Sequence, residues 1–220
     1  MNTIFWLTDD LRLEDNPALV NAAQDDTLTI ISCIDQQAFR TDRFGNLGMG
    51  ALRWQFVQES LIDLQKGLAK HGQTLNLLSG KPSEVVSDLL HTGRFDRVVR
   101  TRQHNSKEMA IWQYLGEMFP DILFDEYDSS TLYSLSAVCF TESFPATFSQ
   151  FRRSLDAVAF RTVVHEPEQL PETLEFELES LALQTRDQSS IPRGGTSAGR
   201  EHVEAYFSTH APSTYKETRN

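Results

Sequence analysis

Short apolar runs alternate with longer amphipathic segments along the first part of the chain. Five apolar runs are predicted to form buried strands, at residues 3–7, 27–34, 74–80, 96–102 and 122–127. Apolar side chains spaced three and four residues apart predict helices between them, at residues 17–23, 51–72, 82–93 and 106–119. Strands that alternate with helices in this way pair in parallel through right-handed crossovers. The pattern therefore predicts the α/β class, as a doubly wound, Rossmann-like sheet of five parallel strands.

Charged residues crowd the loop that follows the first strand. In a doubly wound sheet, ligands bind outside the carboxyl ends of the strands, so this loop belongs to the predicted binding face. Alternatively, these charged residues have only structural roles. In that case Asp15 and Asn16 cap the helix that begins at Pro17, and Asp10 forms an ion pair with Arg12.

The alternation stops after residue 128. Residues 144–158 look like a helix with Phe148, Phe151 and Leu155 on one face, and residues 166–200 are rich in Glu, Pro, Ser and Gly, which indicates a linker. A new helical pattern then begins at residue 196. We therefore expect three regions, namely an α/β domain, an interdomain helix with an acidic linker, and the start of a truncated second domain, at residues 1–135, 136–195 and 196–220.

Composition narrows the classes of function. The chain has 220 residues, of which 40% are hydrophobic, and a net charge of −11, so it repels phosphate backbones and is not expected to form the main surface for nucleic acid. Its two cysteines, Cys33 and Cys139, form no CxxC pair, which makes a disulfide framework or a thiol metal site unexpected. The chain shows neither a signal peptide nor an apolar run long enough to cross a membrane, so we expect a cytoplasmic protein without membrane association.

Catalytic signatures are missing from the sequence. No GxGxxG follows the first strand, no phosphate-binding GxxxxGK[ST] or GxSxG motif occurs, and the six histidines lack metal-ligand spacing. The sequence GGTSAG at residues 194–199 has no strand before it, which favours a flexible hinge over a phosphate loop. We therefore predict neither catalytic residues nor a metal site.

Four segments in consistent order resemble the photolyase/cryptochrome family, and most closely its DASH-type branch. The opening segment matches the family pattern, except at Leu7 and Thr8, through Trp6, Asp10, Leu11, Arg12, Asp15 and Asn16. The segment 48–82 matches through Gly50, Arg53, Phe56, Ser60, Asp63, Gly72, Gly80 and Pro82. The third match combines STLY at residues 130–133 with FPATFSQFRRSLDA at residues 144–157. The fourth combines GG at residues 194–195 with YKETRN at residues 215–220.

The resemblance implies the N-terminal domain of a DNA photolyase or DASH-type cryptochrome. In that family a C-terminal helical domain holds FAD and the DNA lesion, and the excited flavin transfers an electron that splits a pyrimidine dimer. The N-terminal domain often carries an antenna chromophore, either a folate (methenyltetrahydrofolate) or a deazaflavin. We expect this chain, without its helical partner domain, to bind at most the antenna chromophore, and neither to hold FAD tightly nor to repair DNA.

Several residues are candidates for the antenna site. The resemblance gives Glu108 a contact with a pterin and Arg53 a place beside the antenna. The alternatives are a capping box of Glu108 with Asn105, and a salt bridge from Arg53 to an acid of the loop 8–15. Topology and position along the chain add the remaining candidates, namely Cys33, Asp35, Asp10 and Gln103. The glycine-containing loop 40–50 is predicted to be a mobile lid over this site.

The C-terminal end supplies two further matches, with roles only in the intact protein. Tyr215 corresponds to a residue that contacts FAD and Arg219 to one near the DNA lesion. Aromatic side chains around Phe148 are expected to pack on the α/β domain or on the missing domain, and without that domain an exposed apolar patch would favour self-association. Two other functions stay open at this point, a stand-alone nucleotide- or pigment-binding module and a protein-interaction module, neither with enzyme activity.

Overall fold

The structure is a computed structural model that describes residues 1–134, 136–138, 144–174, 178, 180–183, 192–210 and 212–218. Its strands are β1 (Asn2–Leu7), β2 (Thr27–Ile34), β3 (Leu75–Ser79), β4 (Arg97–Thr101) and β5 (Leu123–Tyr127). The α-helices of the described residues are α1 (Pro17–Ala22), α2 (Ala51–Lys70), α3 (Pro82–His91), α4 (Ser106–Met118), α5 (Phe148–Leu155), α6 (Thr196–Phe207) and α7 (Tyr215–Thr218). A short 3-10 helix, η1 (Gln36–Phe39), follows β2.

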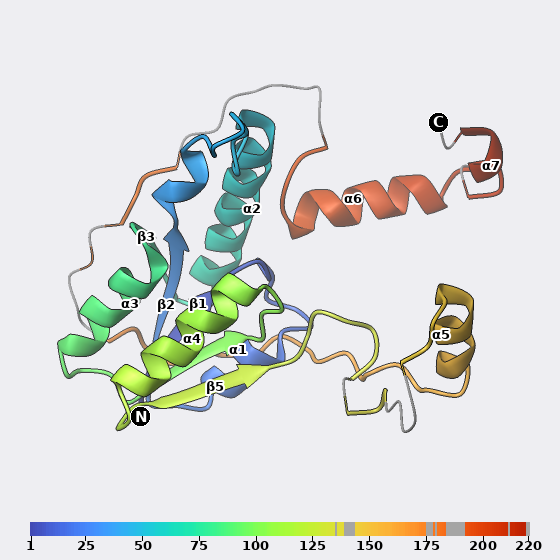
Figure 1. Cartoon of the computed structure of the whole chain (residues 1–220). Coiled ribbons are helices and arrows are strands. Elements are labelled where there is room, and N and C mark those ends of the chain that lie inside the picture. The colour runs from blue at the N-terminus through green and yellow to red at the C-terminus, as the bar shows by residue number, and fades with distance from the viewer. Residues whose placement is uncertain are drawn as a thin grey trace.

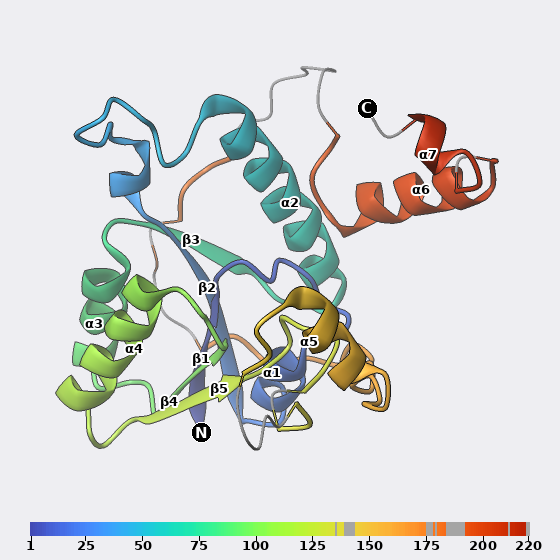
Figure 2. The same cartoon turned by 45° about the vertical axis from the view of Figure 1, so that its right-hand side comes forward.

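The five strands form one parallel sheet in the order β3-β2-β1-β4-β5. Helices α1 and α2 cover one face, and α3 and α4 cover the other (Figures 1 and 2). The predicted doubly wound α/β fold is therefore confirmed. Strands β2 and β3 are added on one side of β1, and β4 and β5 on the other. The topological switch point therefore lies between the carboxyl ends of β1 and β4, where such folds bind ligands.

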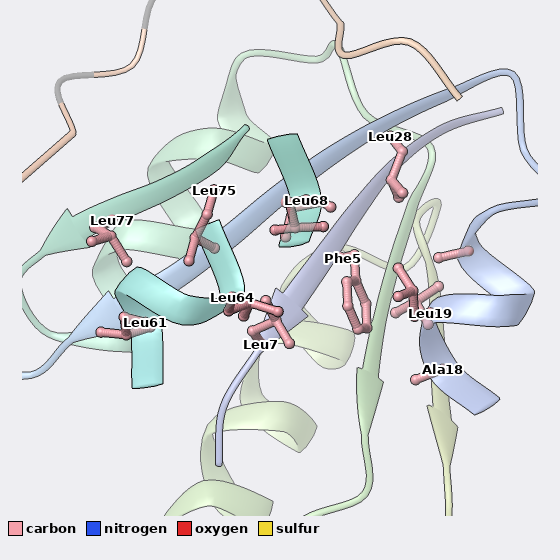
Figure 3. Close-up of a cluster of buried hydrophobic side chains, with 13 residues drawn as sticks. Phe5, Leu7, Ala18, Leu19, Leu28, Leu61, Leu64, Leu68, Leu75 and Leu77 are labelled. Carbon is pink, nitrogen blue, oxygen red and sulfur yellow. The ribbon is translucent and has the colours of Figure 1, made fainter. Parts of the chain in front are cut away.

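The strands are apolar on both sides because both faces of the sheet are covered. On β1, Phe5 and Leu7 point toward α1 and α2, where Figure 3 shows them among the leucines of these helices. Ile4 and Trp6 point toward α3 and α4. Alternation within an unbroken apolar run thus divides the core into two clusters, one on each side of the sheet.

The predicted apolar face of α2 is correct for only part of the helix. Leu61, Leu64 and Leu68 are buried against the sheet, whereas Leu52 and Phe56 are about half exposed. The first turns of α2 lie beyond the carboxyl ends of the strands, so they have no sheet to pack against (Figures 1 and 2).

The cap of α1 matches only half of the prediction. Asn16 Oδ1 accepts the Leu19 N–H at 3.0 Å, which confirms it as the cap. Asp15 is not a cap: it has a positive φ of 51°, and its carboxylate binds Arg161, with Nη1 at 2.7 Å from Oδ1. Its backbone N–H also donates to the Val164 carbonyl at 2.8 Å, so Asp15 holds a distant segment of the chain.

The segment after β5 runs back along the sheet. Helix α5 is shorter than the predicted 144–158, and the described residues between α5 and α6 contain no further helix or strand. The Leu28 N–H donates to Glu172 O at 3.0 Å, and the Leu181 N–H donates to Leu77 O at 2.8 Å. Residues around 172 and 181 therefore cover the β3 side of the sheet, where an open edge would otherwise remain.

No helix among the described residues is both long and apolar enough to span a membrane. Cys139 and Arg219 lie outside the described residues.

Candidate functional site

A cavity of about 610 Å³ opens at the carboxyl ends of β1 and β2. Its walls come from η1, the first turns of α2 and α4, and the start of α6. Five predicted residues line it, namely Asp10, Cys33, Asp35, Arg53 and Glu108. Because α2 and α4 cover opposite faces of the sheet, Arg53 and Glu108 approach the cavity from different sides of the rim.

Aromatic side chains form much of the apolar wall. Trp54 packs edge-to-face on Phe39 with ring centroids 5.1 Å apart, and Trp6 and Phe56 line the same space. Trp54 is partly exposed here. Rings of this kind suit a flat conjugated ligand.

Glu108 lies in the first turn of α4 and is partly buried. Burial raises the pKa of its carboxyl, and the nearby Asp9 raises it further. Asn105 caps α4, because its side chain accepts the Lys107 N–H at 2.9 Å. The alternative capping box is incomplete among the described residues, because the Glu108 side chain makes no return bond to Asn105. Within the part of the chain that the structure describes, the Glu108 carboxylate has no hydrogen-bond partner, so it is available to a ligand.

Arg53 occupies the first turn of α2 and is exposed toward the cavity. Its Nη1 donates to the Gly48 carbonyl at 3.2 Å. The alternative salt bridge to the loop 8–15 does not form among the described residues. Its other guanidinium donors are therefore available to an acidic group of a ligand.

An ion pair crosses the rim of the cavity. Lys107 Nζ lies 3.0 Å from Asp35 Oδ2 and joins the start of α4 to the end of β2. Asp35 also caps η1 by accepting the Gln37 N–H at 2.9 Å. Lys107 could not be recognised from the sequence, because its partner lies 72 residues away along the chain.

Arg100 lies at the floor of the cavity with only 1% of its side chain exposed. Its Nε and Nη2 donate to Glu126 Oε1 at 2.9 and 2.7 Å. The guanidinium carbon lies 4.2 Å from the Trp112 ring centroid and 5.5 Å from that of Trp6. Arg100 was not among the predicted residues, although an arginine inside an apolar strand is a signal that a buried partner exists.

Asp10 is buried beneath the loop after β1. Its Oδ2 accepts hydrogen bonds from Thr101 Oγ1 and from Asn16 Nδ2, while its Oδ1 is buried without a partner among the described residues. The expected Asp10–Arg12 ion pair is wrong, because Arg12 donates instead to Asp15 O at 2.9 Å. Burial raises the pKa of the Asp10 carboxyl, and the hydrogen bond from Thr101 only partly offsets this effect.

The Asp10 contacts predict different outcomes for two substitutions. Asp10→Ala removes the acceptor of two buried donors and should lower the free energy of unfolding by about 1–3 kcal/mol. Asp10→Asn keeps an acceptor oxygen and should cost less. A carboxyl with a raised pKa in the folded state loses stabilisation as the pH rises from its ordinary pKa toward the raised value. Urea unfolding at about pH 4 and pH 7 should therefore show a smaller difference in the free energy of unfolding between the wild type and the Asn variant at the higher pH. A difference that does not change with pH would contradict the prediction.

Gln103, which was predicted to belong to the site, is not among the residues that line the cavity. Its Nε2 donates to Thr8 Oγ1 at 2.5 Å and to Thr101 O at 3.2 Å, which directs the side chain to the loop after β1. Cys33 does line the cavity, and burial raises the pKa of its thiol to about 12, so it is not a nucleophile at neutral pH. Tyr215 is the first residue of α7.

The family model described as DNA photolyase matches residues 3–172, which is more than half of the chain. The chain belongs to the DNA photolyase family. The predicted resemblance to photolyases and cryptochromes is therefore confirmed, and the DASH-like character follows from the relatives. Cryptochrome DASH of Idiomarina loihiensis is 31% identical over 225 residues, covering 99% of this chain and 49% of the relative. The chloroplastic/mitochondrial cryptochrome DASH of Arabidopsis thaliana is 31% identical over 236 residues, covering 99% and 42%.

Solved structures of the family share the fold. A cryptochrome from Synechocystis sp. PCC6803 superposes with a TM-score of 0.87 and 25% identity, covering 99% of this chain and 48% of that one. An archaeal photolyase from Sulfolobus tokodaii, described with two FAD molecules and an implied novel light-harvesting cofactor, has a TM-score of 0.73 and 20% identity, covering 91% of this chain and 45% of that one. This photolyase-family chain spans about half the length of the curated relatives it matches, and its sheet is that of the N-terminal α/β domain.

Proposed function

We propose that this photolyase-family domain binds a flat antenna chromophore in the cavity and passes absorbed light energy to a flavin in a second domain. The observation that carries the proposal is the meeting of Glu108, Arg53 and the aromatic wall in one cavity at the switch point of the sheet. Together they offer a hydrogen-bond acceptor, a cation and stacking surfaces.

A folate such as methenyltetrahydrofolate fits this combination. An ionised Glu108 carboxylate can accept paired N–H bonds from the 2-aminopyrimidinone edge of a pterin, and Arg53 can bind the acidic tail. A deazaflavin is the second candidate, because it also has a flat ring with an N–H edge. Burial and the nearby Asp9 raise the pKa of Glu108. When the solution is acidified, Glu108 should therefore become protonated, and chromophore binding should weaken, at a higher pH than for an exposed glutamate.

Glu108→Gln is the direct test of the site. The substitution exchanges one acceptor oxygen for a donor and removes a charge-assisted bond, so the affinity for methenyltetrahydrofolate should fall roughly 10- to 100-fold. Binding is measured by titration of the chain with the folate, followed through the absorption of the bound pigment.

Glu117→Gln is the matched control, because Glu117 lies on the same helix, is exposed and pairs with Gln113. It should bind as the wild type does. Equal affinity of the Glu108 and Glu117 variants would contradict the proposed site, and so would failure of both the folate and a deazaflavin to bind the wild type.

We propose that the other activities of the family require a second, helical domain. We infer that FAD and DNA bind the helical domain that begins near residue 196, and that the whole protein is a deoxyribodipyrimidine photolyase or DASH-type cryptochrome. Exposed Phe144 and Phe148 are consistent with a face that contacts that domain, and self-association of the chain alone remains a prediction. A cytoplasmic location is likewise a prediction, since the Arabidopsis relative carries a chloroplastic/mitochondrial name.

A further inference from the structure

Helix α6 is folded although none of its residues is buried. It has 12 residues, and isolated helices of about this length are marginal in water. Its first turn lies beside α2 and the helix then runs away from the α/β domain (Figures 1 and 2). The contacts that hold α6 must therefore be found at its N-terminal end.

Three carboxylates meet the start of α6. Glu59 Oε2 accepts the Gly194 N–H at 2.8 Å, and Asp63 Oδ2 accepts the Ser197 N–H at 3.0 Å. Glu14, in the loop after β1, forms an ion pair with Arg200. We call Glu14, Glu59 and Asp63 the acidic cradle.

The acidic cradle replaces a cap that α6 lacks. Its N-cap residue is Gly195, which has no side chain to accept the free N–H groups of the first turn. Asp63 supplies that acceptor from another helix, and a carboxylate at this end also interacts favourably with the helix dipole. Burial of Asp63 opposes its ionisation, but hydrogen bonds from Ser197 and Thr196 together with the charge of Lys66 outweigh this and lower the pKa of its carboxyl.

Two glycines allow the start of α6 to lie close to α2. A Cβ on Gly194 would lie 2.1 Å from the Phe56 carbonyl oxygen, which cannot move without breaking α2. Gly195 has a φ of +101°, and a Cβ there would lie 2.6 Å from the Asp63 Cβ. The predicted flexible hinge is therefore wrong: these glycines fit closely against α2.

We propose that the acidic cradle is the docking surface for the first turn of the second domain. Gly195 and Thr196 line the cavity together with Phe56 and Ser60 of α2, so docking also fixes one wall of the cavity. Glu59 and Asp63 then act as positioning residues that set where the second domain starts. The inference requires no ligand in the cavity.

Hydrogen exchange of the whole chain, followed by mass spectrometry, tests this proposal. In the wild type, peptides from α6 should exchange measurably more slowly than an unstructured segment. Gly194→Ala should speed their exchange at least tenfold and leave the strands of the sheet unchanged. Gly199→Ala is the control within α6, because a Cβ there meets nothing within 4 Å and alanine favours the helix, so protection should stay the same or rise.

Two substitutions at Asp63 separate docking from general destabilisation. Asp63→Ala should unfold α6 as Gly194→Ala does, whereas Asp63→Asn keeps an acceptor for the Ser197 N–H and should retain most of the protection. The proposal is overturned if α6 is already unprotected in the wild type, or if its exchange is the same in the Gly194→Ala and Gly199→Ala variants. It is also overturned if Asp63→Ala and Asp63→Asn behave alike.

Discussion

Replacing Arg100 with alanine is expected to lower the free energy of unfolding by about 3–5 kcal/mol. The side chain is 1% exposed, and its loss leaves the partly buried Glu126 carboxylate without its main partner. It also removes the guanidinium contacts with the rings of Trp6 and Trp112 and the donors to the Glu108 carbonyl, each 3.4 Å away. The substitution should therefore weaken the floor of the cavity as well as the fold.

Urea unfolding of two arginine variants measures this effect. Arg102→Ala is the control, because Arg102 Nε lies 3.9 Å from Oε2 of the same Glu126 but its side chain is 45% exposed. An exposed pair of this kind should contribute less than about 1 kcal/mol. Replacing Arg100 with Met and Glu126 with Leu together should recover part of the loss, because no charge is then left unpaired. Equal destabilisation by the two single substitutions would show that burial does not determine the strength of this interaction.

Replacing Phe5 with alanine is expected to have a similar effect, about 3–5 kcal/mol. The Phe5 ring is 1% exposed and lies in the cluster that α1 and α2 share (Figure 3). Its removal leaves a cavity bounded by Leu19 and Leu64, among others, and the surrounding helices can close only part of it. Because α2 carries Arg53, Glu59 and Asp63, loss of this packing should also loosen the candidate site.

Phe44→Ala is the matched control for the core substitution. The Phe44 ring is 72% exposed in the loop between η1 and α2, so its removal should change stability by no more than about 0.5 kcal/mol. Both variants are compared with the wild type by urea unfolding, with the slope of the transition checked for each. A loss below 2 kcal/mol for Phe5→Ala would mean that the two helices repack over the vacant space.

The sheet was predictable because its signals are local. Unbroken apolar runs such as residues 27–34 reveal strands covered on both faces, and Asn16 before Pro17 marks a helix start. Topology and position along the chain placed Asp10, Cys33 and Asp35 at the candidate site, since parallel strands end at the same edge, whereas Arg53 and Glu108 came from the resemblance to the family. Gln103 escaped this reasoning because its side chain is directed by Thr8, whose position the strand pattern does not determine.

Long-range contacts account for what the sequence did not reveal. Asp15 has the residue type and position of a cap, but Arg161, 146 residues away, binds its carboxylate. Gly194 lies in a sequence typical of a flexible segment, but it packs against α2. The Phe56 carbonyl oxygen occupies the place where a side chain at position 194 would lie. Such roles depend on which surfaces meet after the chain has folded, and a periodic pattern carries no information about this.

The bond between Leu181 and Leu77 has a consequence for how this domain can be shortened or exchanged. A polypeptide that stopped soon after β5 would keep all five strands but would present β3 unprotected to other molecules, an arrangement that invites intermolecular pairing and aggregation. The sheet and the acidic segment that follows α5 should therefore be transplanted or inherited as one piece.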